Sequence, residues 1–168
     1  MMTKEQLIQA LDLKPLPLEG GYFRETYRAE MLVNVNKDNS LEPAQRSLGT
    51  AIFYLVTPEE YSKLHRVKHD ELFHFYLGDA VEMLQLDEAG KTKVITLGPN
   101  ILTGEQIQTL APAHVWQGTR LKAGGAWALL GTTMSPGFDY SDFELGNYKE
   151  LSSQFPQHSD KLKLYCGN

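Results

Sequence analysis

The residues best suited to chemistry lie between His65 and Gly78, in the segment HRVKHDELFHFYLG. Three histidines and a glutamate (His65, His69, His74 and Glu71) stand there beside a run of aromatic residues. Histidine and carboxylate side chains are common ligands of borderline metals, and they also form general acid–base pairs. The segment therefore indicates a metal site, a proton-transfer site or a structural polar cluster.

The alternation in ELFHFYLG (71–78) predicts a strand, whose successive side chains point to opposite faces. Glu71 and Phe73 then share one face, while His74 and Tyr76 share the other. If Glu71 faces a barrel interior, His74 faces away unless a bulge intervenes. His74 is then either packed between sheets or at a dimer seam, hydrogen-bonded to a tyrosine, or part of the pocket.

His65 and Glu71 are expected on adjacent strand segments joined by a turn over 67–70. From there the two side chains can converge inside a barrel. We interpret them as a ligand-binding or acid–base pair. The alternative is an ion pair or hydrogen bond that serves only the structure, because a buried carboxylate without a partner is costly.

A second group of candidates lies on the predicted strand 22–28, where Tyr22, Arg24 and Thr26 share one face. An arginine on a barrel-lining strand can hold a carboxylate or phosphate with two hydrogen bonds. The alternative is a structural pair between Arg24 and a glutamate on a neighbouring strand. Trp127 is expected either in the core or as a wall of the pocket.

The bulk composition is that of a globular protein of one domain, which we place at 1–168 with a barrel at about 20–135. The net charge of -5, with both signs interspersed, argues against nucleic-acid binding. No apolar run of membrane-spanning length is present. The N-terminus has the pattern of an amphipathic helix and not of a signal peptide. With a single cysteine, Cys166, the composition favours a cytoplasmic protein.

The pattern of elements predicts an all-β protein with a helix at each end. Thr3 and Gln6 have the spacing of a capping box, which predicts a helix over 3–12. The polar stretch 34–46 is expected to be a loop or a loose hairpin. Short helical segments are expected after 136–137. Close-set strands with Gly and Pro turns between them predict a sandwich or barrel, and they are placed at 22–28, 49–57, 71–78, 80–87, 92–98, 105–111, 114–121 and 125–134.

Longer strings carry a resemblance to a family, namely EGGYFRETYR, HRVKHDELFHFYLGD, TLGPNILTGEQIQ, PAHVWQG, GAWALLGTT and SPGFDYSDFELG. With them the chain resembles a small family of the cupin superfamily long filed as a domain of unknown function. The resemblance implies a double-stranded β-helix (jelly-roll barrel) like that of the sugar-nucleotide 3,5-epimerases, and a homodimer. His65 and Glu71 stand where the first cupin motif has ligands, whereas Val67 and Gln117 replace two expected histidines.

These observations predict a cupin that binds a small ligand, carbohydrate-like or anionic, in its barrel. As an enzyme it would be an epimerase or isomerase, with His65 or Glu71 as base, Tyr22 or Tyr76 returning the proton, and Arg24 holding an anionic group. The remaining ligand-binding candidates are Thr26, Phe73, His74, Gln117 and Trp127. One alternative is a metal-dependent enzyme that holds Fe, Mn, Ni or Zn with His65, Glu71 and Gln117. This alternative is disfavoured because two strong ligands fall short of the usual three or four. The other is a non-catalytic binding or storage protein.

Overall fold

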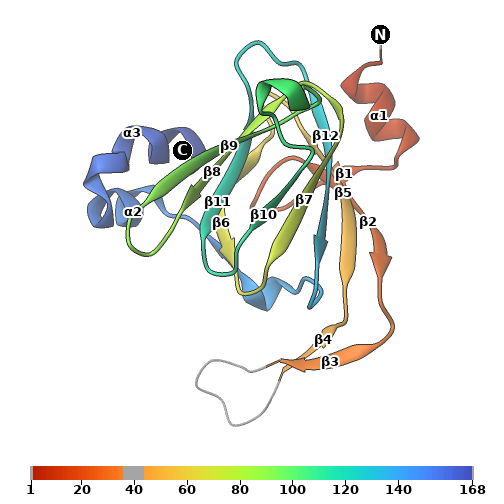
Figure 1. Ribbon diagram of the computed structural model, residues 1–168. Helices are drawn as coiled ribbons and strands as arrows, with labels where there is room; N and C mark the ends of the chain where they lie inside the picture. The colour runs from red at the N-terminus through yellow and green to blue at the C-terminus, as the bar shows by residue number, and fades with distance from the viewer. Residues whose placement is uncertain (1, 36–43, 168) are drawn as a thin grey trace.

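Two antiparallel β-sheets face each other in the computed structural model, which describes residues 2–35 and 44–167 (Figure 1). The first sheet has the strand order β1-β2-β5-β12-β7-β10, and the second β13-β6-β11-β8-β9. The strands of the first are β1 (Lys14–Pro15), β2 (Tyr22–Arg28), β5 (Thr50–Val56), β7 (Glu71–Gly78), β10 (Gln108–Ala111) and β12 (Ala128–Met134). Those of the second are β6 (Ser62–Val67), β8 (Val81–Leu86), β9 (Thr92–Leu97), β11 (Trp116–Leu121) and β13 (Phe143–Leu145). The predicted all-β jelly roll is confirmed.

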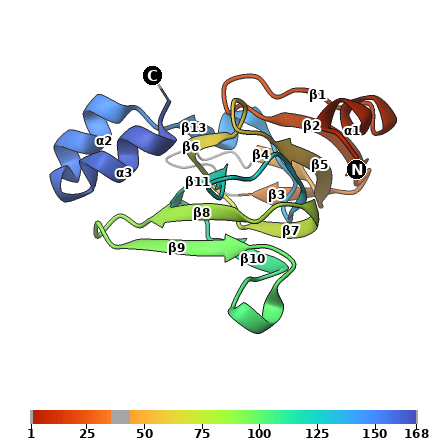
Figure 2. The same cartoon turned by 90° about the horizontal axis from the view of Figure 1, so that it is seen from above.

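The space between the sheets is filled by side chains that alternate along each strand. Figure 2 shows the sheets as two layers around this core. The largest side chains there are at most 1% exposed, and they are Tyr54, Phe73, Met83, Leu97 and Leu130. Because Phe73 lies in this cluster, the face of β7 that carries Glu71 and Phe73 is the inner one.

The N-terminal helix α1 (Lys4–Ala10) begins with the predicted capping box, in which Thr3 and Gln6 bond each other's backbone N–H. It packs on the outer face of the first sheet (Figure 1). The buried residues at this contact are Leu7, Leu13, Leu55 and Leu129. The helix therefore covers one end of a sheet face that would otherwise be open to water.

The C-terminal helices α2 (Tyr148–Gln154) and α3 (Ser159–Tyr165) pack on the second sheet, as predicted for the tail. Three short 3-10 turns complete the chain, η1 (Ile101–Thr103), η2 (Tyr140–Asp142) and η3 (Pro156–His158). One part of the predicted helical tail is wrong, because Phe143–Leu145 forms strand β13, which pairs with β6. Within the described part of the chain, no helix has the length and apolar character needed to cross a membrane.

A two-stranded hairpin, β3 (Leu32–Val35) with β4 (Ala44–Ser47), extends away from the barrel (Figure 1). The sequence predicted a loop or loose hairpin over 34–46, and the two described ends of this stretch pair with each other. Residues 36–43 lie outside the described residues.

One buried ion pair ties the base of this hairpin to the segment after β12. Arg46 donates from Nε to Asp142 Oδ2 at 2.6 Å and from its terminal nitrogen to Oδ1 at 2.9 Å. The side chains are 10% and 5% exposed, respectively. A bidentate pair of this kind fixes the position of η2, which contributes to the cavity described below.

We predict that Asp142→Asn lowers the free energy of unfolding by about 3 kcal/mol, because it leaves the Arg46 guanidinium buried without a counter-charge. Urea denaturation followed by circular dichroism measures the change. The control is Glu144→Gln, which breaks the exposed pair of Arg66 and Glu144 and should cost less than about 1 kcal/mol. Equal losses in the two variants would contradict the role given to Asp142.

Candidate functional site

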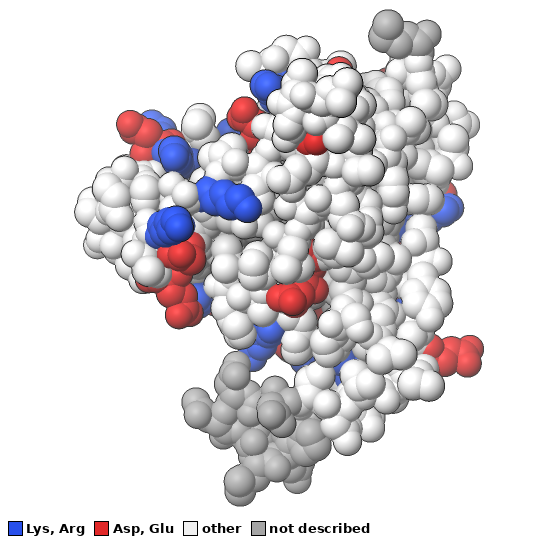
Figure 3. Space-filling model, in the orientation of Figure 1, with Lys and Arg blue, Asp and Glu red and all other residues white. Residues whose placement is uncertain are grey.

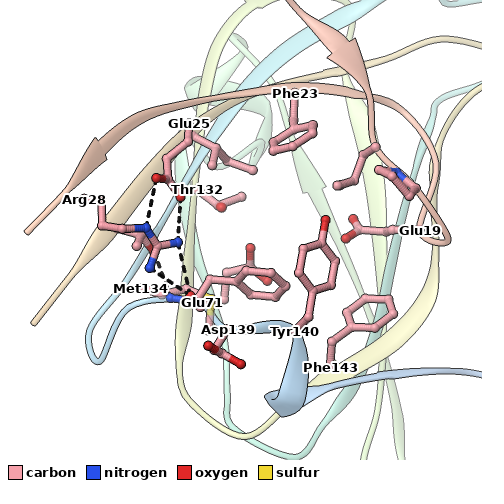
Figure 4. Close-up of a pocket in the computed structure, with 15 residues that line it drawn as sticks. Glu19, Phe23, Glu25, Arg28, Glu71, Thr132, Met134, Asp139, Tyr140 and Phe143 are labelled. Carbon is pink, nitrogen blue, oxygen red and sulfur yellow. Dashed lines mark hydrogen bonds and ion pairs between the residues drawn. The ribbon is translucent and has the colours of Figure 1, made fainter. Parts of the chain in front are cut away.

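A cavity of about 490 Å³ lies against the inner face of the first sheet (Figure 4). Its walls come from the loop before β2, from β2, β5, β7 and β12, and from the segment 138–143. Aromatic rings and carboxylates dominate the lining, and the residues used below are Glu19, Phe23, Glu71, Tyr140 and Phe143. A cavity of this size with a few polar groups is the usual form of a small-molecule site.

Glu71 is the buried acid of this cavity, with 8% of the residue exposed. Its Oε2 accepts a hydrogen bond of 2.6 Å from Gln117 Nε2, which lies on β11 of the opposite sheet. Burial raises the pKa of Glu71, and the charge of Glu19 adds to the rise, whereas His65 and the bonds from Thr132 and Gln117 oppose it. Glu71 therefore holds a proton at higher pH than an exposed glutamate does, which suits a general acid.

His65 lies behind the cavity lining, of which it is not itself a part, with 2% of the residue exposed, and its ring stacks on Phe143 at 5.2 Å between centroids. Its Nδ1 is 2.8 Å from the carbonyl oxygen of Lys63. Since a carbonyl only accepts, Nδ1 must carry a proton, so Nε2 is the nitrogen that has the lone pair whenever the ring is neutral. That atom is 3.9 Å from Glu19 Oε2, so the basic nitrogen of His65 lies next to a cavity carboxylate.

Glu19 is a site residue that the sequence reasoning missed. Its Oε1 accepts a hydrogen bond of 2.7 Å from Ser62 Oγ on β6, and its carboxylate points into the cavity (Figure 4). The sequence shows only a glutamate before two glycines, a pattern typical of a turn. In the folded chain this turn lies at the cavity, where the Glu19 carboxylate is near the His65 ring.

Tyr140 was missed for the same kind of reason. It lies in the turn η2, and its hydroxyl points into the cavity between Phe23 and Glu19 (Figure 4). The signal that could have found it is the string FDYSDF, in which aromatic and acidic residues alternate after the last long strand.

The predicted orientation of strand β2 is wrong. Phe23 and Glu25 line the cavity, whereas Tyr22, Arg24 and Thr26 do not. Tyr22 packs in the cluster beneath α1. The Arg24 guanidinium lies 5.5 Å from the centroid of the Phe53 ring, and Thr26 Oγ1 donates to the carbonyl of Ala51 at 3.1 Å. The strand has aromatic and charged residues on both faces, so alternation alone does not say which face is inside.

Strand β7 has the orientation that its alternation predicts. His74 and Tyr76 stack on each other outside the barrel, with ring centroids 6.2 Å apart. His74 Nε2 is 3.0 Å from Thr133 Oγ1, and burial lowers the pKa of His74. Tyr76 is 45% exposed, so neither it nor His74 reaches the cavity. Trp127 packs in the cluster under α1 and its Nε1 donates to the carbonyl of Met2 at 3.2 Å, so it is not a cavity wall.

The structure brings His65, Glu71 and Gln117 together, but not as a set of metal ligands. Gln117 directs its amide N–H at Glu71, and Val67 is 4% exposed where the cupin motif has a second histidine. Among the residues described, no three His, Cys, Asp or Glu side chains are grouped to hold a metal ion. These residues do not fit the three or four strong ligands of a usual transition-metal site.

Two facing sheets around a cavity define a jelly-roll barrel of the cupin kind, and sequence comparison agrees. Residues 5–146 match the family described as cupin superfamily (DUF985). The chain therefore belongs to this family of cupins, as its sequence strings predicted.

Two solved structures share this fold, and a third protein is similar in sequence. A hypothetical protein from Leishmania major has 30% identity and a TM-score of 0.90, with 99% of this chain and 100% of that one covered. Protein SO0799 from Shewanella oneidensis has 29% identity and a TM-score of 0.87, with 99% of each chain covered. The uncharacterized protein YML079W of Saccharomyces cerevisiae is 27% identical over 133 residues, which are 74% of this chain and only 66% of the yeast protein.

A more distant likeness concerns the fold alone. Oxalate decarboxylase has 17% identity and a TM-score of 0.54, and the match covers 94% of this chain but 38% of that one.

The raised pKa of Glu71 gives a prediction for stability against pH. When the pKa of a carboxyl group is higher in the folded than in the unfolded chain, the free energy of unfolding of the protein falls as pH rises from about 4.5 through the raised pKa. Wild type should therefore lose stability in urea between pH 5 and pH 8 relative to Glu71→Gln, which has no such proton to release. The control is Glu59→Gln, an exposed carboxyl whose pKa is lowered and which should keep the wild-type slope. A Glu71→Gln slope equal to that of wild type would contradict the burial argument.

Proposed function

We propose that this cupin binds a small carbohydrate-like molecule in the cavity and moves a proton on it, as an epimerase or isomerase does. The observation that supports this most is the buried Glu71 carboxyl, with its raised pKa, in a cavity beside the basic Nε2 of His65. A proton donor and a proton acceptor with different surroundings are what proton transfer next to a carbonyl requires.

In this proposal His65, at Nε2, takes a proton from the carbon next to a carbonyl, and Glu71 gives a proton to the oxygen. Tyr140 replaces Tyr22 and Tyr76 as the tyrosine that can return a proton, because its hydroxyl points into the cavity (Figure 4). An anion-binding role for Arg24 loses its basis, since Arg24 does not line the cavity.

The proposed chemistry can be tested by deuterium exchange. The protein is incubated in D₂O with a panel of aldoses and ketoses, and NMR follows deuterium at the carbon next to the carbonyl. We expect exchange with at least one sugar, and a fall of about 100-fold or more in Glu71→Gln and in His65→Asn.

The matched control for these variants is Glu59→Gln, which lies outside the cavity and should exchange at the wild-type rate. A sugar that binds without exchange would favour the non-catalytic alternative. Exchange that persists in both cavity variants would disprove the roles given to His65 and Glu71.

We further propose that two copies associate through the outer face of the first sheet. Large apolar side chains are exposed there, with Tyr76 at 45%, Leu77 at 46% and Leu110 at 44%. Strand β10 is the edge of this sheet, and an edge strand is open to pairing with another chain. In Figure 3 the charged side chains gather mainly over the C-terminal helices, and an acidic group lies near the centre of the view. An exposed apolar face next to an open edge suits a homodimer.

Light scattering after size-exclusion chromatography tests this association. We expect a mass of two chains for wild type and of one chain for Leu110→Lys, because a lysine would have to be desolvated at the contact. Leu164→Lys, at an exposed position of α3, should leave the mass at two chains. A wild-type mass of one chain would refute the proposal.

A further inference from the structure

We infer that the cavity takes a small organic cation, such as a protonated or quaternary amine, in preference to an anion. The inference rests on the proposed role of the cavity as a small-molecule site, and it specifies the charge of the ligand. It departs from the expectation of an anionic ligand, which depended on Arg24.

More acidic than basic side chains line the cavity. Arg28 lines it, but Glu25 already pairs with this guanidinium through bonds of 2.9 and 2.7 Å, and the carbonyl of Phe138 accepts from it as well. Within the described ranges, neither Glu19 nor Glu71 forms an ion pair with a lysine or arginine. Of the acidic residues that line the cavity, Glu19, Glu71 and Asp139 therefore have no ion pair with a lysine or arginine among the described residues, whereas the guanidinium of Arg28 already has the carboxylate of Glu25.

One buried polar atom next to Glu71 has no partner and can only accept a hydrogen bond. Gln117, which does not itself line the cavity, is 1% exposed, and its Oε1 has no hydrogen-bond partner, while its Nε2 donates to Glu71. His65 Nε2 lies 3.9 Å from Glu19 Oε2, and in the neutral form of the ring these two atoms are both acceptors. Such an arrangement is stabilised by a ligand that donates hydrogen bonds or carries positive charge, and destabilised by an anion.

The walls of the cavity favour a cation for an independent reason. The rings of Phe23, Tyr140 and Phe143 surround the space into which Glu19 points (Figure 4). The face of an aromatic ring attracts an ammonium group, most strongly where water is excluded. Aromatic walls with carboxylates beneath them are thus suited to an ammonium group on an otherwise apolar or hydroxylated molecule.

Three probes of the same shape and different charge test the inference, namely choline, its neutral isostere 3,3-dimethylbutan-1-ol and the anion 3,3-dimethylbutanoate. Each is titrated into the ¹⁵N-labelled full chain, and NMR follows the amides of Glu71, Thr132 and Tyr140. We expect choline to bind about tenfold more tightly than the neutral probe and the anion to bind most weakly. The preference should shrink severalfold in Glu71→Gln, in Glu19→Gln and in Tyr140→Leu, and the same spectra report whether each variant is folded.

The control is again Glu59→Gln, which removes one carboxylate outside the cavity and should keep the full preference for choline. Equal binding of the three probes, a preference for the anion, no shift with any probe, or a preference for choline that survives in the cavity variants would each overturn the inference. The outcome of the deuterium-exchange experiment does not depend on any of these results, so the proposed proton transfer is tested separately.

Discussion

The hydrogen bond between Glu71 and Gln117 joins the two sheets inside the barrel. A carboxylate in this place is expensive, because burial removes it from water without a lysine or arginine in return. The structure offsets part of this cost with the hydrogen bonds from Gln117 and Thr132, and burial still leaves the pKa of Glu71 raised. A protein that needed only a stable barrel could fill this space with apolar side chains, as it does around Phe73 and Leu130. The expensive carboxylate is the physical reason to assign function to this end of the barrel.

Much of the fold could be predicted because its signals are local. Alternation places Glu71 and Phe73 on one face of β7 and His74 and Tyr76 on the other, and the inner face proves to be the one with Glu71. The capping box at Thr3 and the strand positions depend on a few neighbouring residues in the same way. The cupin pattern also named Glu71 and Gln117 together, but as metal ligands, and the hydrogen bond between them was not predicted.

The rest of the site could not be predicted because it depends on contacts between distant segments. Both faces of β2 carry aromatic and charged residues. The face with Tyr22 is the outer one because α1 packs on it, together with Trp127 of the loop before β12. Tyr140 lies two residues before Asp142, which is held by Arg46 from the hairpin. No periodicity within a strand carries information of this kind.

The differences between the predicted and the observed cavity lining change the chemistry of the site in the same direction. Arg24, which was predicted to bind an anion, does not line the cavity. Glu19 and Tyr140, which were not predicted, line it and supply an acceptor and an aromatic ring. The charge of Glu19 also helps to raise the pKa of Glu71, so a cation bound between them would lower that pKa and draw the proton from Glu71. Ligand charge and proton transfer are therefore coupled through one carboxyl group. A substrate that brings a positive charge would set the protonation state of the residue that acts on it.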